Sequence, residues 1–582
     1  MKTWLEHVLA LGVISALFAG VVSHQGCTLK ERLFPDKKRQ VDVERPAGES
    51  ENPYYHYILG YRYTASGRIE DAIEEMERAV ELDPASPFLR ITLARLYLEK
   101  GRAEEALLQA QKAVELDPGY AAGHLLLAGI YSATKRHDAA IAEYETVLRI
   151  EPDNEKARLF LSSLYASSGQ DQKAIAVLQE LLAQRQDWFV GYYHLGRLYA
   201  EQKRYKEALE CLQKALSLSP QSELVLLEMA RLYELRNEQD KAIGIYDQIL
   251  RDDPSNLLVH DRLGQIYIGQ RKLDQALNHL KAMESLVEGQ DALQVHLKMG
   301  LIYLEQKNYE KAIQEFLVVL AGRPEEHRVR YYLGFAYAEN GQPAAAEEIF
   351  RQIPARAEIY PEAMLYLGYL LQSENKLDEA VAAVEQALGS VPDNEALWGF
   401  LAFLYEQRQE YDKAIECAKK ALALSPGSAR LHFSLGVLYD KKGELEESIQ
   451  EMKTVISLEP DNAEALNYLG YTYADRGIHL EEAEALIQKA LRLRPDDGYI
   501  IDSLGWVYFQ QGRFREAVRE LERAVTIVPD DAIILEHLGD AYEKVRAHPK
   551  ALEMFRRALE KDPANKRLQE KTGEMERRLR KE

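Results

Sequence analysis

The sequence predicts an all-α fold in which about fifteen helical hairpins stack into a solenoid. Three observations support this prediction. A small residue, a Tyr three positions later and an Ala or Ser nine positions after the Tyr recur every thirty-four residues, apart from two insertions. Apolar residues within each unit follow helical spacing. The chain of 582 residues is also too long for one compact core, whereas the core of a repeat array simply extends.

The first element, residues 1–26, has the pattern of a secretory signal. One Lys is followed by an uncharged apolar run from Val8 to Val22, and Cys27 comes shortly after it. As a helix, this run would span roughly 22 Å, which is short of the ~30 Å hydrocarbon core of a bilayer. We therefore expect a cleaved signal rather than a membrane span.

Gly26 and Cys27 resemble the cleavage site of a bacterial lipoprotein, which implies that Cys27 becomes the acylated first residue of the mature chain. His24 departs from the pattern, since such sites usually carry Leu three residues before the Cys. Thr28 is not the Asp associated with inner-membrane retention, so the resemblance implies the periplasmic side of a bacterial outer membrane. Inner-membrane anchoring by an uncleaved segment reaching back to Trp4, and secretion to the periplasm without lipid, remain the alternatives.

The second element, residues 27–52, is predicted to carry the acylated Cys and a flexible tether. From Thr28 to Asn52 the chain is polar and rich in charge, contains Pro35 and Pro46, and has no helical apolar stripe. A flexible segment of ~25 residues would place the folded part on average ~28 Å from its anchor.

The third element, residues 53–565, consists of the hairpins. In one unit, Leu195, Gly196 and Tyr199 share a face of a first helix. Ala208 and Leu212 share a face of a second helix. The small residues allow the two helices to approach closely, and the Tyr is expected to fill the space toward the neighbouring unit. A Pro stops the second helix in several units, namely Pro84, Pro118, Pro152, Pro220 and Pro254.

The repeat is strongly non-random, because fourteen of the 34 Tyr occupy one place in it. The small residues are Gly60, Ala94, Ala128, Ser162, Gly196, Ala230, Gly264, Gly300, Gly334, Gly368, Ala402, Gly436, Gly470, Gly505 and Gly539. With its Tyr, Ala and Pro, this pattern matches the four diagnostic places of the tetratricopeptide repeat family, of which the chain is identified as a member. The resemblance implies a right-handed superhelix whose first helices line the concave surface.

Two interruptions indicate possible bends in the array. Extra residues lie near residue 289, and residues 354–361 contain Pro354, expected inside a second helix, and Pro361. Leu371 then takes the place of the repeat Tyr. The last element, residues 566–582, is charged and is predicted to be a capping helix or tail.

Composition argues against several functions. The excess of 94 acidic over 73 basic residues gives a net charge of −21, which argues against a nucleic-acid partner. No HExxH, GxSxG, phosphate loop or Cys-x-x-Cys motif is present, so we expect no enzyme, cofactor or metal site. His194, His296 and His432 are interpreted as surface or packing residues.

The family resemblance implies a protein-binding groove along the first helices, at the second, fifth, ninth and twelfth positions of each unit. Aromatic residues recur at these positions and form an apolar row that could bind a helix or an extended segment of a partner. The alternative is that the rings pack against the adjacent first helix. The candidate groove residues are Tyr54, Tyr57, Tyr61, Phe88, Tyr193, Tyr331, Phe335, Tyr369, Phe403, Phe433, Tyr471, Tyr499 and Trp506.

A narrower resemblance appears near the C-terminus. The stretches Leu466–Gly477 and Asp502–Trp506 are similar to bacterial outer-membrane lipoproteins with these repeats, including the lipoprotein partner of a periplasmic C-terminal processing protease. This resemblance implies a lipid-anchored scaffold or adaptor that delivers substrates to a protease. An assembly factor for an exopolysaccharide-export or pilus machine, and a non-catalytic subunit of an envelope enzyme, are the alternatives. The sequence does not indicate an oligomeric state.

Overall fold

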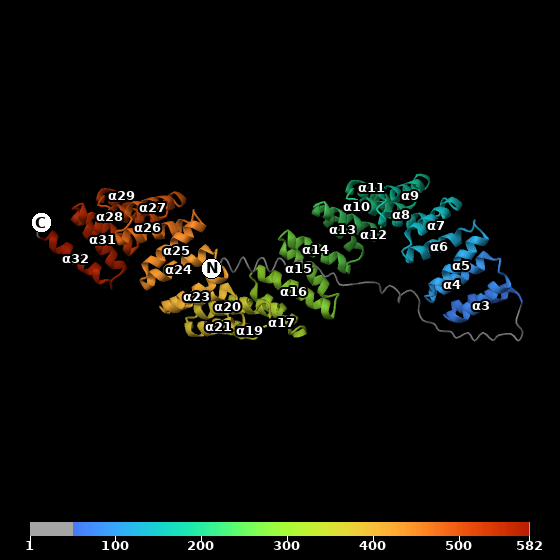
Figure 1. The fold of residues 1–582 in the computed structure, drawn as a ribbon, viewed down its shortest axis with the longest axis horizontal. Coiled ribbons are helices and arrows are strands. Elements are labelled where there is room, and N and C mark those ends of the chain that lie inside the picture. Colours follow the sequence, from blue (N-terminus) through green and yellow to red (C-terminus); the bar gives the residue numbers. More distant parts are fainter. Residues whose placement is uncertain (1–50, 581–582) are drawn as a thin grey trace. The chain divides into compact units, whose positions relative to one another are not determined.

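The computed structural model describes residues 51–580, which form thirty-one α-helices and no β-strand (Figure 1). Helices α2 to α31 pair into fifteen antiparallel hairpins, with an even-numbered first helix and an odd-numbered second helix. The described chain divides into two compact units, residues 51–295 and 296–580. The predicted all-α solenoid of helical hairpins is thus confirmed.

The N-terminal unit contains α2 (Pro53–Ala65), α3 (Ile69–Leu82), α4 (Pro87–Glu99), α5 (Ala103–Leu116), α6 (Ala121–Ala133), α7 (His137–Ile150), α8 (Glu155–Ser167), α9 (Asp171–Gln184), α10 (Phe189–Glu201), α11 (Tyr205–Leu218), α12 (Glu223–Leu235), α13 (Gln239–Asp252), α14 (Leu257–Gly269) and α15 (Leu273–Glu284). Helix α16 (Gly289–Glu305) includes the division between the units.

The C-terminal unit contains α17 (Tyr309–Gly322), α18 (His327–Glu339), α19 (Pro343–Arg351), α20 (Tyr360–Ser373), α21 (Leu377–Ser390), α22 (Glu395–Gln407), α23 (Tyr411–Leu424), α24 (Ala429–Lys442), α25 (Leu445–Leu458), α26 (Ala463–Arg476), α27 (Leu480–Leu493), α28 (Gly498–Gln510), α29 (Phe514–Ile527), α30 (Ala532–Lys544), α31 (His548–Lys561) and α32 (Lys566–Leu579).

The turn inside each hairpin is closed by the same backbone hydrogen bond throughout the array. In each turn a residue such as Lys203 takes a positive φ, here 60°, and the backbone N–H of the next residue donates to the carbonyl at the repeat Tyr position, as Arg204 does to Tyr199 over 2.8 Å. This six-to-one bond ends the first helix and reverses the chain. The positive-φ residues are Gly67, Gly101, Lys135, Gly169, Lys203, Asn237, Arg271, Lys307, Gly341, Asn375, Gln409, Gly443, Gly477, Gly512 and Arg546. The turn between α26 and α27 has a second positive-φ residue, His479 at 48°.

At nine of its ten glycines, the small residue of the repeat lies where the two helices of a hairpin touch, and Gly264 is the exception. A Cβ added to Gly196 would lie 2.9 Å from Cγ of Leu212, and one added to Gly539 would lie 2.5 Å from the ring of Phe555. Neither distance is compatible with a side chain larger than hydrogen. The recurring small residue therefore sets the spacing of the hairpin.

The repeat Tyr connects neighbouring hairpins. Tyr199 is buried, and its hydroxyl accepts a hydrogen bond of 2.9 Å from Gln179 on the second helix of the preceding hairpin. The guanidinium of Arg204 lies 4.4 Å from the centre of the same ring. The hydroxyl of Tyr97 also bonds to the second helix of the preceding hairpin, where it donates to Glu77 over 2.5 Å. The prediction that this Tyr fills the space toward the neighbouring hairpin is confirmed, and that hairpin is the preceding one.

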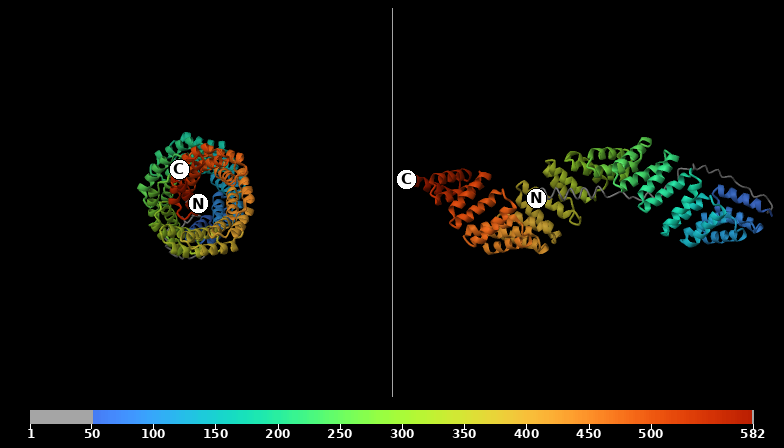
Figure 2. Two further views of the ribbon diagram at one scale, coloured as in Figure 1. Left: turned by 90° about the vertical axis from the view of Figure 1, so that its left-hand side faces the viewer. Right: turned by 90° about the horizontal axis from the view of Figure 1, so that it is seen from above.

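Within each of the two compact units, the first helices of neighbouring hairpins also pack against one another. Contacts recur between α4 and α6, α8 and α10, and α10 and α12 in the N-terminal unit, and between α26 and α28 and α28 and α30 in the C-terminal unit. Second helices of neighbouring hairpins make no comparable contact among the described residues. First helices thus approach more closely than second helices, so each stack curves with the first helices on its inner side. Figure 2 shows successive hairpins packed side by side along each stack.

The two predicted bends coincide with irregular helices. Helix α15 has only 12 residues, and α16 begins at Gly289, whose φ is 60°. The expectation that Pro354 lies inside a second helix is wrong, because α19 has only 9 residues and ends at Arg351. A Pro within the helix would remove one backbone hydrogen bond, so the chain instead leaves the helix before it.

Helix α32 covers the last hairpin. The ammonium group of Lys571 lies 2.6 Å from carboxylate oxygens of both Glu536 and Asp540 on α30. Burial raises the pKa of Asp540, while the nearby Lys571 opposes that rise. Leu568 and Met575 of α32 are buried. The helix thus closes the apolar end of the stack with a charged outer surface.

Candidate protein-interaction surface

The candidate groove residues differ in exposure, although the repeat places them similarly. Tyr54, Tyr61, Phe88 and Tyr499 are exposed, and Tyr57, Tyr369, Phe403, Phe433 and Tyr471 are half-buried. Tyr193, Tyr331, Phe335 and Trp506 are buried. Nine of the thirteen residues therefore present a ring to solvent in the described chain. That these rings bind a partner stays a prediction.

The four buried residues are part of the packing between helices. The ring of Tyr331 lies 5.9 Å from that of Phe350, and the ring of Phe335 lies 5.3 Å from that of Tyr366. Tyr193 belongs to a buried apolar cluster that includes Leu212 of α11, and its ring meets edge-on that of the adjacent His194, whose pKa is lowered by burial. In the described structure these rings stabilise the stack and do not offer a free face to a partner.

Trp506 shows this most clearly. Its ring stacks on His537 at 4.0 Å and on Phe509 at 4.7 Å, so neighbours occupy both faces. Nδ1 of His537 lies 3.0 Å from a carboxylate oxygen of Asp502, and both of these side chains are buried. The stretch Asp502–Trp506 therefore contributes a buried polar and aromatic cluster that fixes α30 against α28.

A row of half-buried rings runs along four consecutive first helices of the C-terminal unit. Tyr369 on α20, Phe403 on α22, Phe433 on α24 and Tyr471 on α26 form this row, which we call the aromatic row. Each ring rests on a neighbour: Tyr369 lies 4.0 Å from Phe400, for example. One side of each ring is thus fixed while the other side meets solvent, an arrangement that preorganises a surface for binding.

The sequence interpretation missed residues two positions before the small residue of the repeat. Ile58 at this place is exposed. Tyr366 and Tyr468 at the equivalent place donate hydrogen bonds to Glu339 over 3.1 Å and Asp440 over 2.7 Å, on the preceding first helix. Burial and these carboxylates raise the pKa of both phenols. Because these tyrosines recur two positions before the Gly of the repeat, the sequence pattern could have identified them.

The C-terminal end of the aromatic row is acidic. Burial raises the pKa of Tyr471, and the negative charges of Asp475, Asp502 and Glu536 raise it further, while Arg567 opposes them. Asp502 is buried against His537 and Glu536 pairs with Lys571 and Arg567, whereas Asp475 is exposed, so Asp475 is the carboxylate at this end that a bound positive charge could meet.

The histidines that the sequence assigned to packing pair with carboxylates inside a hairpin. Nδ1 of His296 lies 2.7 Å from Glu315, and Nδ1 of His432 lies 2.5 Å from Glu451. Within residues 51–580, no group of three or more His, Cys, Asp or Glu could hold a metal ion. Burial raises the pKa of the Cys417 thiol to about 11, which disfavours the reactive thiolate.

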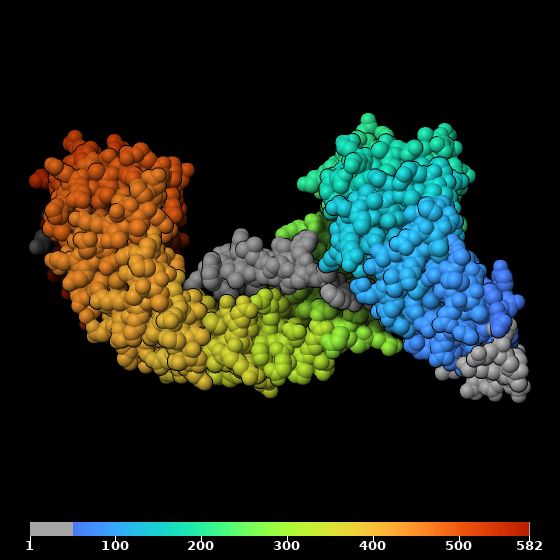
Figure 3. All heavy atoms as spheres, turned by 45° about the vertical axis from the view of Figure 1, so that its right-hand side comes forward, coloured from blue at the N-terminus to red at the C-terminus, as the bar shows by residue number. Residues whose placement is uncertain are grey.

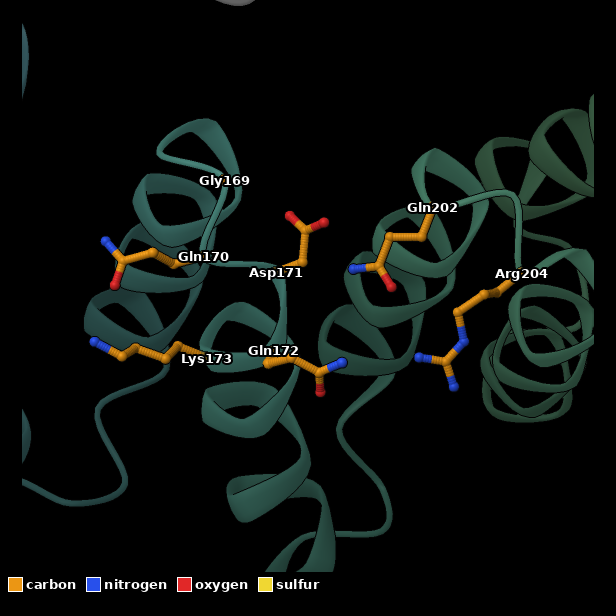
Figure 4. Close-up of a pocket in the computed structure, with 7 residues that line it drawn as sticks. All are labelled: Gly169, Gln170, Asp171, Gln172, Lys173, Gln202 and Arg204. Atoms are coloured by element: carbon orange, nitrogen blue, oxygen red, sulfur yellow. The ribbon is translucent and has the colours of Figure 1, made fainter.

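The hollows in the described surface are open and are lined by both polar and apolar groups. Figure 4 shows one of them, in which Gly169–Lys173 and Gln202 and Arg204 come from the turns of two neighbouring hairpins. A second hollow contains Trp398, whose ring lies 4.5 Å from the ammonium of Lys420 and whose Nε1 donates to the carbonyl of Pro392. Neither hollow includes a ring of the aromatic row.

Cys27 and the predicted signal and tether up to residue 50 lie outside the described residues. Among the helices that the structure does describe, none is both long and apolar enough to cross a bilayer. The predicted lipid anchor therefore stays a prediction.

Sequence comparisons match the chain to the tetratricopeptide repeat within residues 63–326. Profiles of the tetratricopeptide repeat match residues 63–128, 133–195, 189–222, 224–256 and 262–326. A profile of the C-terminal domain of cilia and flagella-associated protein 70 matches residues 325–577. A tetratricopeptide repeat-containing protein of Pseudomonas aeruginosa is 53% identical over 57 residues, which is 10% of this chain and 10% of that protein.

Solved structures with similar repeats are distant in sequence. A tetratricopeptide repeat protein from Parabacteroides merdae is 17% identical, with 43% of this chain and 98% of that chain covered and a TM-score of 0.37. The Cut9–Hcn1 heterotetramer of the APC/C gives 16% identity, 84% and 98% coverage and a TM-score of 0.35. Scores this low do not allow the arrangement of their helices to be transferred to this chain.

Proposed function

Because this chain belongs to the tetratricopeptide repeat family, which builds scaffolds for protein–protein interaction, we propose that it is a lipid-anchored adaptor that binds protein partners along the aromatic row. Its anchor is an acylated Cys27, and it faces the periplasm from a bacterial outer membrane. It delivers substrates to a processing protease.

The aromatic row is the observation that carries the proposal. A soluble array needs no exposed rings on its inner surface, yet four consecutive first helices each keep one half-exposed aromatic side chain. Buried contacts with neighbours, such as Tyr369 against Phe400, hold these rings in place before binding. The best-placed rings of this kind each contribute ~2 kcal/mol or more to the free energy of binding when a partner covers them.

The charge distribution suggests the partner's chemistry. An apolar row that ends beside the exposed Asp475 fits a segment with apolar side chains followed by Lys or Arg. Salt screening then weakens the charged contacts more than the apolar ones. The protease assignment has separate support, namely the resemblance of Leu466–Gly477 to lipoprotein partners of such enzymes.

Capture from native envelope extract tests the proposal. Full-length protein is compared with a Phe403→Ser, Phe433→Ser variant of the aromatic row, and the bound proteins are identified by mass spectrometry. A matched control carries Leu424→Ser and Leu458→Ser, which replace exposed apolar residues at the ends of second helices. We expect a protease and its substrates with the wild type and the control, and their loss with the row variant.

Each part of the proposal can fail separately. Equal capture by the row variant would contradict the assigned surface, and recovery of export or pilus components instead would contradict the protease role. Intact-mass measurement of the purified chain reads out acylation of Cys27 independently of any partner.

A further inference from the structure

The N-terminal unit begins with an exposed apolar surface that the proposed adaptor function does not use. Tyr54, Ile58 and Tyr61 lie at i, i+4 and i+7 on α2, and Phe88 on α4 adjoins them through Tyr57, 5.3 Å away. We call Tyr54, Ile58, Tyr61 and Phe88 the α2 patch. Tyr54 and Tyr61, at 70% and 66%, are the two most exposed large apolar residues in the described part of the chain.

The packing of the repeats explains why this surface is open. Thr92 of the next first helix is too small to cover Tyr61, and the structure describes no hairpin before α2. Arg62 lies two residues after the small residue of its hairpin. In later hairpins this position holds a buried apolar residue, for example Leu96 or Leu198. A charged residue there opposes the stacking of another hairpin onto α2. This surface is therefore poorly suited to contact a second copy of the chain end to end.

The charges around the α2 patch differ from those of the whole chain. Helix α2 contains no acidic residue, and α4 contains only Glu99 at its end, although the chain carries a net charge of −21. Arg62 and Arg95 on the same two helices are exposed. The patch thus combines tyrosines, aliphatic and aromatic surface and two guanidinium groups, a composition suited to the boundary between lipid phosphates and acyl chains.

We propose that the α2 patch contacts the surface of a phospholipid bilayer that contains anionic lipid, with Arg62 and Arg95 toward the phosphates. The inference rests on the proposed acylation of Cys27, because α2 begins at Pro53, only 26 positions after that residue. A second contact close to the anchor strengthens attachment and restricts how the chain is oriented on the membrane. The contact also sets the first hairpin, shown in blue in Figure 3, against the membrane.

An environment-sensitive dye tests this contact in the full-length chain. The dye is attached to Ala65→Cys, which is exposed one turn beyond Tyr61 on the same face of α2, or to Ser434→Cys, exposed on α24, as the matched control. The protein is added to vesicles of phosphatidylethanolamine and phosphatidylglycerol containing a lipid-borne quencher. We expect a blue shift and quenching at position 65 and neither at position 434.

Two variants locate the effect within the α2 patch. Tyr54→Ser with Tyr61→Ser, and separately Arg62→Glu with Arg95→Glu, should bring the quenching at position 65 down to the level of the control. These side chains are exposed, so circular dichroism and thermal melts should match those of the unmodified protein.

Three outcomes would overturn the inference. They are absence of lipid quenching at position 65, a blue shift already complete without vesicles, which would indicate a covering segment of the same chain, and a shift that depends on protein concentration, which would indicate a second copy. Intact mass reports acylation of Cys27 separately. A failed anchor is thus distinguishable from a failed membrane contact.

Discussion

The same residue type serves opposite roles in this chain. Tyr199 is buried between hairpins, bonded to Gln179 and covered by Arg204, whereas Tyr54 on the first helix is mostly exposed. The energetic consequence of losing each ring differs accordingly, because truncation of a buried ring leaves a cavity and truncation of an exposed ring does not.

Replacement of Tyr199 by Ala should lower the free energy of unfolding by about 3 kcal/mol, since both ring burial and the bond to Gln179 are lost. Urea denaturation followed by circular dichroism measures the change. Tyr54→Ala serves as the control and should alter stability by less than about 0.5 kcal/mol. Equal effects of the two substitutions would contradict the assigned packing.

Lys203 offers a prediction of opposite sign. Its φ of 60° strains any residue with a Cβ, and Gly occupies the equivalent place in seven of the fifteen hairpins. Lys203→Gly should therefore stabilise the protein by about 0.5 kcal/mol, the left-handed strain relieved minus the added freedom of the unfolded chain. The neighbouring Gln202, with φ −81°, provides the control, because Gln202→Gly should not stabilise. A lower denaturation midpoint for Lys203→Gly would refute the strain argument.

Paired helices within a hairpin are fixed by a recurring polar contact. His124 and His432 each pair with a Glu nineteen residues later on the second helix, and their Nε2 atoms lie near the carbonyls of Pro118 and Pro426. In the hairpin of α14 and α15 the second partner is also a histidine. Nδ1 of His260 lies 3.0 Å from Nδ1 of His279, so at least one imidazole must be neutral.

This His–His pair predicts a pH dependence of stability. Burial lowers the pKa of His279 and the nearby His260 lowers it further, while Asp247 opposes the change. The unfolded chain therefore binds the proton more readily, so the contribution is present above pH ~6.5 and is lost as the pH falls from there toward the folded pKa. His279→Glu, which restores the pair found elsewhere, should stabilise the protein more at pH 5.5 than at pH 8.

Hydrogen exchange of α14 and α15 at pH 5.5 and pH 8 tests the predicted pH dependence of stability within one hairpin. After correction for the intrinsic exchange rate, protection in the wild type should decrease at low pH in these helices, and His279→Glu should reduce the loss. The hairpin of α6 and α7, with its His124–Glu143 pair, is the internal reference. Equal loss of protection in both hairpins would count against the His–His pair as the cause.

At the scale of the whole molecule, the repeat determines almost everything that the sequence can predict. Periodicity located the hairpins, the buried Tyr and the close approach at most of the small residues. It did not predict which inner rings are exposed. Phe335 and Phe403 occupy the same repeat position, yet Tyr366 of the next unit covers the former, whereas the residue equivalent to Tyr366 beside the latter is only Ser434.

Trp506 follows the same rule, because His537 of the next unit stacks on it. Exposure at an inner position is therefore set by two residues from different repeats, thirty-one positions apart in this case, and by the side-chain direction of both. A periodic pattern read one repeat at a time cannot supply that information. Pro354 is a second feature whose outcome the pattern did not predict, because α19 ends before this Pro and is not kinked by it.

Site-specific photo-crosslinking tests the central claim most directly, namely that partners bind along the aromatic row. A photoreactive amino acid replaces Phe433 on α24 or, as the control, Leu458 on α25, and the cells are irradiated before extraction. The account predicts crosslinks to protein partners, among them a protease or its substrates, from position 433 and not from position 458. Crosslinks from position 458 alone would show that partners use the second helices and would contradict the account.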